Sequence, residues 1–233
     1  MFDEFVVIQK IIAAITVGYL LGSVPFAQLA ARLKGVDIFT TGSRRAGSAN
    51  VFWNISRRTG VLVCAGDVAK GFLAVYIASL LNLPGLLVIL AGGAAIVGHW
   101  KPVFTHFRGG DGMATLMGVT LGLTPLLALL GTLVAVLVVI LIWKSHFRSP
   151  ATLVSCFASI LILSQYYPYF LEDQEAVFGT VILAMLVLFH NLFVQRRVTG
   201  ILLSEQLDMD RDINDDSEID ENTDIGQPAP EKL

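Results

Sequence analysis

Long apolar runs separated by short polar loops fill residues 1–200 of the chain. A membrane-spanning helix needs about 20 predominantly apolar residues. The runs that approach this length are residues 11–33, 59–82, 84–99, 112–122, 124–143, 151–167 and 176–194. The third and fourth runs are short, which indicates helices that are tilted, broken or partly re-entrant. The pattern predicts an all-α polytopic membrane protein with about seven transmembrane helices.

Two details of the apolar runs concern helix boundaries and helix packing. The fourth and fifth runs meet at "GLTP", residues 122–125, where the proline either separates two helices or kinks one long helix. The sequence leaves both possibilities open. Small residues spaced four apart let helices approach closely, and two pairs have this spacing, Gly18/Gly22 and Gly118/Gly122. We interpret these glycines as packing residues.

The composition agrees with a membrane location. Apolar residues make up 55% of the chain, compared with roughly 45–50% in a soluble globular domain, and the mean hydropathy is +0.70. The N-terminal stretch contains Asp3 and Glu4 and lacks the basic region of a secretory signal peptide. We therefore expect the first apolar segment to remain as a span.

The loop charges predict an orientation, because basic residues collect on the cytoplasmic side of a membrane. With seven spans, one set of loops contains Arg32, Lys34, Arg44, Arg45, Arg57, Arg58, Lys101, Arg108, Lys144, Arg148, Arg196 and Arg197. The opposite set contains only Lys10, and its longest loop, residues 167–176, is acidic. This asymmetry predicts a multi-pass protein of the cell inner (plasma) membrane, with the N-terminus outside and the C-terminus in the cytoplasm.

The composition changes at the end of the last apolar run. Residues 201–233 contain eleven acidic residues against two basic ones, a net charge of −9, whereas residues 1–200 carry +6. This tail is predicted to be disordered and cytoplasmic, after a membrane domain formed by residues 1–200. The stretch "DRDINDDSEIDE" resembles a calcium loop in its acidic positions, but Asp215 occupies the position that requires glycine. We therefore do not expect calcium binding.

Three polar segments lie on the predicted cytoplasmic side, residues 42–58, 98–115 and 190–197. They are richer in Gly, Ser, Asn, His and Arg than a simple connection requires, although orientation alone explains some of the arginines. Glycines let successive backbone N–H groups turn toward an anion. The glycines in question are Gly42, Gly47, Gly109, Gly110 and Gly112. Thr115 is expected to cap or begin the fourth helix.

The glycine-rich loop "FRGGDGMAT", residues 107–115, contains an apparent contradiction. With Lys101 and Arg108 nearby, it has the composition of an anion site at a helix start. Yet Asp111 lies at its centre. A carboxylate at that point repels a phosphate unless a cation pairs with it.

Several other ionisable residues lie within or at the ends of the apolar runs. Asp67 and Lys70 in "GDVAKG" share one helix face, and such a pair in a membrane is either a functional group or an internal ion pair that holds helices together. His99 and His190 end apolar runs, where an imidazole can cap carbonyls or act as an acid, base or donor. No His, Cys or Asp cluster has the spacing of a metal site. We expect no metal and no cofactor.

Four motif-like segments follow one another along the chain: residues 22–43, 67–71 and 98–115, and His190 with Gly200. Through them, most of residues 18–200 resembles the bacterial membrane glycerol-3-phosphate acyltransferases that use acyl phosphate as donor. "GSVPFAQLAARLKGVDIFTTGS" (22–43) is similar to the start of that family's first motif, and "DVAKG" (67–71) to its Asp-x-x-Lys-Gly element. "GHWKPVFTHFRGGDGMAT" (98–115) is similar to Gly-His-x-x-Pro-x-Phe followed by Gly-Gly-Lys-Gly-x-Ala-Thr. His190, with Gly200 ten residues later, is similar to the third motif.

The resemblance implies transfer of a fatty acyl group from acyl phosphate to the sn-1 hydroxyl of glycerol 3-phosphate, giving lysophosphatidic acid in phospholipid biosynthesis. The implied partners are these two substrates and the lipid bilayer, with no nucleic acid. Catalysis is assigned to Ser43 and His190. Substrate binding is assigned to Arg44, Arg45, Gly47, Asn50, His99, Lys101, Arg108, Gly109, Gly110, Asp111, Gly112 and Thr115.

The chain departs from the family pattern at several motif positions. The first motif of the family reads Gly-Ser-Gly-Asn-x-Gly-Ala-Thr-Asn-x-x-Arg, where this chain has "GSRRAGSANVFW", residues 42–53. Arg45 replaces Asn, Ala49 replaces Thr and Trp53 replaces Arg. Asp111 replaces the Lys of Gly-Gly-Lys-Gly, and Phe193 replaces the Asn of the third motif.

These departures leave three interpretations. In the first, which we favour, the chain is a working acyltransferase in which Arg44 and Arg45 supply the lost cations and Asp111 pairs with one of them. In the second, it acylates a non-phosphorylated or cationic acceptor. In the third, it is a catalytically silent relative that binds lipid or a partner. A transporter is the alternative from another class, but it would need internal repeats and ionisable groups near the membrane midplane, which the sequence lacks.

Overall fold

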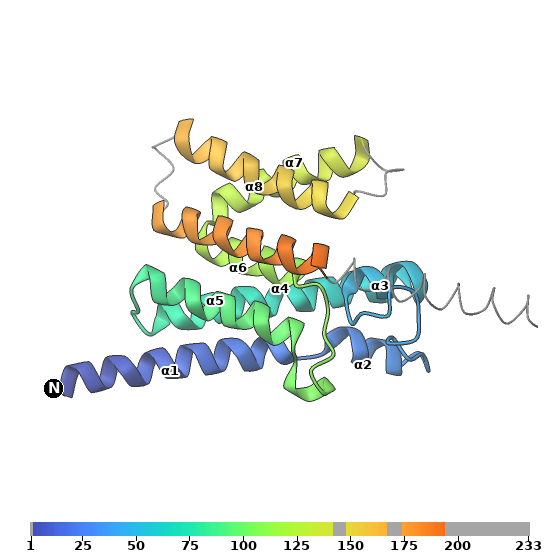
Figure 1. The fold of residues 1–233 in the computed structure, drawn as a ribbon, viewed down its shortest axis with the longest axis horizontal. Coiled ribbons are helices and arrows are strands. Elements are labelled where there is room, and N and C mark those ends of the chain that lie inside the picture. Colours follow the sequence, from blue (N-terminus) through green and yellow to red (C-terminus); the bar gives the residue numbers. More distant parts are fainter. Residues whose placement is uncertain (1, 142–147, 167–173, 194–233) are drawn as a thin grey trace, which may run out of the picture. The chain divides into compact units, whose positions relative to one another are not determined.

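The computed structural model describes residues 2–141, 148–166 and 174–193, and these form helices joined by loops (Figure 1). The chain comprises two compact units, Met1–Phe189 and His190–Leu233. The helices are α1 (Phe2–Ser23), α2 (Phe26–Arg32), α3 (Ser48–Asn54), α4 (Arg57–Leu80), α5 (Gly85–Trp100), α6 (Met113–Leu123), α7 (Pro125–Leu141) and α8 (Arg148–Tyr166), with the short 3-10 helix η1 (Val103–Thr105). A further helix covers Gln174–Phe193. The acidic tail and its calcium-like stretch lie outside the described residues.

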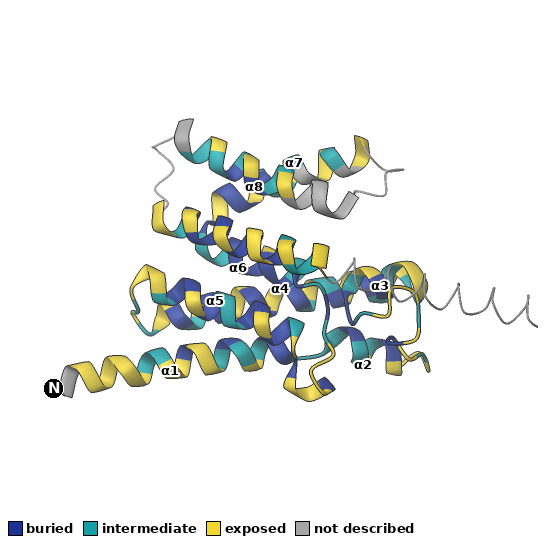
Figure 2. Cartoon of the chain, in the orientation of Figure 1, coloured by how far each residue is buried: buried dark blue, intermediate teal, exposed yellow. Residues whose placement is uncertain are grey.

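The described helices confirm the all-α architecture predicted from the apolar runs. Within residues 2–141, 148–166 and 174–193, four segments are long and apolar enough to cross a membrane: Glu4–Arg32, Arg57–Leu80, Gly85–Thr105 and Gln174–Phe193. The shorter apolar helices are Met113–Leu123, Pro125–Val138 and Val154–Ser164. Large apolar side chains are exposed along these helices, and the N-terminal half of α1 is exposed almost throughout (Figure 2). Such surfaces suit contact with lipid. The count of seven spans stays a prediction.

The structure corrects the sequence prediction at two places and decides between its two alternatives at a third. The first apolar run is divided, because α1 ends at Ser23 and Pro25 lies before α2. The fourth and fifth runs are separate helices, since Thr124 is the C-cap of α6 and Pro125 begins α7. Proline is well tolerated at the first position of a helix, because a backbone N–H there would have no partner within the helix. The predicted cytoplasmic loop 42–58 contains α3, whose seven residues are too few for a helical period to stand out.

Close helix packing at the paired glycines is confirmed. A Cβ atom on Gly18 or Gly22 would collide with backbone carbonyls of α5, and one on Gly118 would collide with the backbone of α4. A Cβ on Gly122 would overlap the side chain of Val75, also on α4. These contacts hold α1 against α5 and α4 against α6 within the first unit (Figure 1). Close approach of this kind supplies the packing contacts that associate helices in a membrane.

A small apolar core supports the first polar loop separately from the main helix core. It contains Ala27, Ala31, Ile38, Phe39, Ala46, Val51 and Val63. These side chains come from α2, α3, α4 and the loop between α2 and α3. The loop that carries the first motif is therefore anchored by its own buried residues.

Candidate functional site

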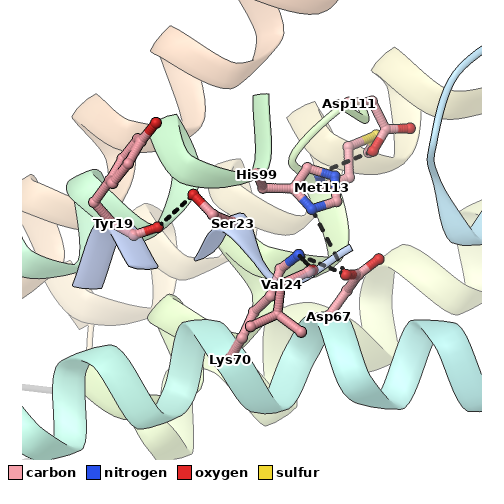
Figure 3. A network of polar contacts seen from close by, with 8 residues as sticks. All are labelled: Tyr19, Ser23, Val24, Asp67, Lys70, His99, Asp111 and Met113. Carbon is pink, nitrogen blue, oxygen red and sulfur yellow. Dashed lines mark hydrogen bonds and ion pairs between the residues drawn. The ribbon is translucent and has the colours of Figure 1, made fainter. Parts of the chain in front are cut away.

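A buried polar cluster joins three segments of the chain (Figure 3). Lys70 Nζ lies 2.7 Å from Asp67 Oδ1, and their side chains are 4% and 2% exposed. Lys70 also donates a 3.3 Å hydrogen bond to the carbonyl of Val24, in the break between α1 and α2. Nδ1 of His99, in the last turn of α5, lies 3.6 Å from the same Asp67 oxygen. The cluster therefore ties α4 to the α1–α2 junction and to the end of α5.

The glycine-rich loop rests directly on His99. The backbone N–H of Gly110 donates a 3.1 Å hydrogen bond to the His99 carbonyl. A Cβ on Gly109 would collide with the carbonyls of His99 and Trp100, and one on Gly110 with the His99 ring and the Ala46 carbonyl. Both glycines are required for this close approach, so the position of the loop depends on that of His99.

Asp111 lies one residue before Gly112, the N-cap of α6, and its side chain supports the start of that helix, which accounts for a carboxylate at this point. Its Oδ1 accepts a 3.2 Å hydrogen bond from the N–H of Met113, the first residue of α6 (Figure 3). The residue between them, Gly112, has φ +83°, a left-handed conformation that favours glycine. A carboxylate at a helix N-terminus satisfies an unpaired N–H and interacts favourably with the helix dipole. Thr115, expected to cap or begin this helix, lies in its first turn and is fully buried.

The first loop meets the glycine-rich loop beside Asp111. The N–H of Ala46 donates a 3.2 Å hydrogen bond to the Gly109 carbonyl. A Cβ on Gly47 would lie 3.9 Å from Asp111 Oδ2, so these residues face each other. A cavity of about 10 Å³ beneath this junction is lined by Ala46, Gly109 and the buried cluster of Asp67, Lys70 and His99. The two loops and the cluster thus form one continuous assembly.

The charge of Arg45 interacts with the charge of Asp111 across the two loops. Burial lowers the pKa of the Arg45 guanidinium, and the negative charge of Asp111 opposes that shift. The group stays protonated because an arginine pKa begins so high. Within the described residues the two side chains do not form a direct ion pair. The arginine predicted to pair with Asp111 therefore interacts with it through charge alone, without a direct contact.

Asn50 holds the first loop in shape. Its buried side-chain amide donates to the carbonyls of Thr41 and Arg45 at 3.0 and 2.9 Å. Its Oδ1 accepts from the N–H of Ser43 at 3.2 Å and from Asn54 at 2.9 Å. These bonds occupy the amide from inside the loop, so Asn50 supports the site and does not reach its surface.

Ser43 and Arg44 lie on the exposed side of the same loop. Arg44 has φ +55°, in the left-handed region that non-glycine residues seldom adopt. The hydrogen bond from the N–H of Ser43 to the Asn50 side chain fixes the backbone beside this turn. Ligand contact by these two residues stays a prediction.

The remaining candidates are divided among other surroundings. Lys101 is exposed, and its carbonyl accepts a 2.9 Å hydrogen bond from Tyr19. The guanidinium of Arg108 stacks 4.1 Å from the centre of the Phe39 ring and lines a separate cavity. His190 lies in the last turn of the helix Gln174–Phe193 and begins the second compact unit, so its proposed action with Ser43 stays a prediction.

Sequence reasoning omitted three groups that position the site. The Trp100 indole donates a 3.0 Å hydrogen bond to the Asp111 carbonyl, Tyr19 donates to Lys101, and the Val24 carbonyl receives Lys70. The indole N–H at the end of an apolar helix was an available signal, since buried tryptophans usually find an acceptor. A backbone carbonyl such as that of Val24 leaves no signal in a sequence.

Comparison with known proteins agrees with this geometry. The family model described as glycerol-3-phosphate acyltransferase matches residues 12–200. A glycerol-3-phosphate acyltransferase of Geotalea daltonii is 37% identical over 78% of this chain and 91% of its own length. The Coxiella burnetii enzyme of that name is 38% identical over 77% of this chain and 90% of its own.

Solved structures are similar over the same region. A crystal structure of PlsY (YgiH), an integral membrane glycerol 3-phosphate acyltransferase, in its glycerol 3-phosphate form has a TM-score of 0.67 and 31% identity, over 82% of this chain and 92% of that one. Its lysophosphatidic acid form has a TM-score of 0.64 and 28% identity over the same shares. This chain is thus an integral membrane protein, and it belongs to the glycerol-3-phosphate acyltransferase family.

Proposed function

We propose that this protein transfers a fatty acyl group from acyl phosphate to the sn-1 hydroxyl of glycerol 3-phosphate, giving lysophosphatidic acid. One observation carries the proposal. The two loops that the family resemblance assigns to the substrates meet at the hydrogen bond from Ala46 to Gly109, with Arg45 and Asp111 beside it. Segments more than fifty residues apart in the sequence thereby share one site.

The reaction requires little covalent participation by the protein. The sn-1 oxygen attacks the acyl carbonyl carbon, the bond from that carbon to the phosphate oxygen breaks, and inorganic phosphate leaves with its bonding electrons. The hydroxyl proton passes to a base, for which His190 is the candidate, or to the departing phosphate. Because phosphate is a good leaving group, the protein contributes mainly by positioning two anions and by donating hydrogen bonds to the developing oxyanion. Ser43 is the proposed donor.

Arg45 is the proposed phosphate-binding cation in place of the Lys found in the family's glycine-rich motif. Asp111 occupies the position of that Lys, but its carboxylate supports the start of α6. Arg45 reaches the same junction from the other loop and is half-buried there, where a charged hydrogen bond is stronger than in open water. A planar guanidinium can also contact two phosphate oxygens at once.

The same proposal includes a location. The motif loops belong to the set of loops that is rich in Lys and Arg. They are therefore assigned to the cytoplasmic face of the inner (plasma) membrane, with the N-terminus outside. Glycerol 3-phosphate would reach the site from the cytoplasm and acyl phosphate from the bilayer.

An exchange of charges between the two loops tests the role of Arg45. Arg45→Asn, Asp111→Lys and the double variant are compared with the parent for glycerol 3-phosphate binding and for turnover. Each single variant should bind glycerol 3-phosphate worse than the parent. Arg45→Asn removes the proposed phosphate-binding cation, and Asp111→Lys puts two cations side by side without a nearby carboxylate. The double variant, which has the family residues at both positions, should bind at least as well as the parent.

Asp111→Asn is the matched control, because asparagine keeps the oxygen that supports the start of α6 but removes the charge. It should bind glycerol 3-phosphate at least as well as the parent. Purely additive effects of the two charge changes would reject the coupling between Arg45 and Asp111. A parent protein that binds an amine or a neutral polyol in preference to glycerol 3-phosphate would reject the proposed acceptor.

A further inference from the structure

A cavity of about 620 Å³ is formed by α2, the start of the α2–α3 loop and the segment around η1. Its walls come from α2, from the residues that follow α2 and from the turn after η1. The residues that matter for its chemistry are Gln28, Arg32, Asp37, His106 and Arg108. Neither Ser43, Arg45 nor Asp111 lines it, so it is separate from the proposed catalytic junction.

Two guanidinium groups give the cavity its charge. Arg32 and Arg108 line it, and within the described residues neither forms an ion pair with a carboxylate. Asp37 lines the same cavity, and one of its oxygens accepts a 2.9 Å hydrogen bond from the N–H of Phe39. The walls therefore carry two positive charges against one negative charge, a surplus that suits a monoanion.

Arg108 is preorganised for a ligand. Its guanidinium stacks 4.1 Å from the centre of the Phe39 ring, and its carbonyl accepts a 2.8 Å hydrogen bond from the Thr105 hydroxyl. His106 and Phe107 before it have φ +52° and +61°. Two successive non-glycine residues in the left-handed region are strained, and such strain is commonly found where a side chain is held for a ligand.

Exposed apolar side chains stand next in sequence to several residues that line this cationic cavity. Leu29 and Leu33 on the α2 side are 48% and 86% exposed, and Phe104 and Phe107 on the η1 side are 58% and 55% exposed. Two of its lining residues, Gln28 and Arg32, come from α2, the helix that follows the break at Pro25. Cations beside apolar and aromatic groups are the combination that binds the headgroup region of a bilayer.

We propose that this cavity binds the phosphate of an acidic phospholipid with a hydroxylated headgroup, such as phosphatidylglycerol. Arg32 and Arg108 contact the phosphodiester, while Asp37 and Gln28 accept hydrogen bonds from the headgroup hydroxyls. The acyl chains lie along Leu29 and Leu33. The site holds a membrane lipid beside the catalytic loops and does not depend on the proposed reaction.

Native mass spectrometry of the full chain in mixed micelles tests the proposal, with phosphatidylglycerol and phosphatidylcholine as competing lipids. The parent should retain phosphatidylglycerol selectively. Arg32→Gln and Arg108→Gln should each weaken its binding by about tenfold, the loss expected for one charge-assisted contact. Lys34→Gln is the matched control, because Lys34 is exposed beside the cavity without lining it, and it should retain the lipid as the parent does.

Two results would overturn the proposal. Equal retention of both lipids, or equal weakening by Lys34→Gln and Arg32→Gln, would reduce the effect to general attraction between the basic surface and anionic lipid. Displacement of phosphatidylglycerol by millimolar inorganic phosphate would identify a free phosphate as the ligand and reject the lipid. Because all three variants change exposed residues, size-exclusion profiles should match the parent and exclude misfolding as the cause.

Discussion

Removal of one charge from the Asp67–Lys70 pair should destabilise the protein more than removal of both. The pair is almost completely buried, and Lys70 has only two oxygen partners within the described residues, Asp67 and the Val24 carbonyl. Asp67→Asn keeps the size of the side chain but leaves an ammonium group without its counter-charge. Lys70→Met keeps much of the length and leaves a carboxylate without its counter-charge.

The expected size follows from the cost of an unpaired buried charge. Breaking a buried ion pair by removing one partner typically costs about 3–5 kcal/mol. Replacing both partners by residues of similar volume is often neutral, although here the Val24 carbonyl would lose its donor, at about 1–3 kcal/mol. The double variant Asp67→Asn/Lys70→Met should therefore cost only about 1–3 kcal/mol, less than either single variant and roughly 3–9 kcal/mol less than their sum.

Thermal unfolding in detergent at one fixed heating rate measures this coupling. For a chain of this size, 3–5 kcal/mol corresponds to a fall in Tm of roughly 6–20 °C. Lys34→Met is the control, because it makes the same substitution at an exposed lysine and should leave Tm within about 2 °C. Single variants that lower Tm no more than this control, or losses that simply add in the double variant, would refute the reasoning.

The remaining predictions concern packing, catalysis and orientation. Gly118→Ala should destabilise the protein by roughly 1–3 kcal/mol in the same thermal assay, because the added methyl meets the α4 backbone, whereas Gly85→Ala, where a Cβ has ordinary space, should not. Ser43→Ala should lower turnover by roughly ten- to a thousandfold with Tm unchanged; near-normal turnover would remove it from catalysis. A cysteine at Gln174 should react with an impermeant thiol reagent outside cells and one at Ser204 should not, and reversed labelling would overturn the orientation.

The sequence predicted the helical architecture and the packing glycines, because both depend on local patterns. A long apolar run and a pair of small residues four apart have direct physical consequences in a membrane. The division at Pro125 was one of two options allowed by the sequence, and the structure has separate helices there. By contrast, the break at Pro25 and the helix α3 were missed, since a short polar interruption and seven helical residues give weak signals.

The sequence predicted which segments form the candidate site, but it did not predict what the individual side chains contact there. The sequence paired Asp111 with a ligand or an arginine, whereas its carboxylate supports the start of α6. Asn50 and Thr115 were expected to bind substrate, yet Asn50 makes hydrogen bonds within its loop and Thr115 is buried in a helix. An amide or hydroxyl in a motif does not reveal whether it points toward the protein or toward solvent, since that depends on the packing of distant segments.

The central claim, acyl transfer to glycerol 3-phosphate, is tested most directly by the product of the purified protein. The full chain in detergent is given acyl phosphate and an equimolar mixture of glycerol 3-phosphate, glycerol and ethanolamine, and the lipid products are identified by mass spectrometry while released phosphate is counted. We expect lysophosphatidic acid acylated at sn-1, with one inorganic phosphate released for each molecule formed. An acylated glycerol or ethanolamine as the main product, or no acyl transfer from protein that binds glycerol 3-phosphate, would contradict the account.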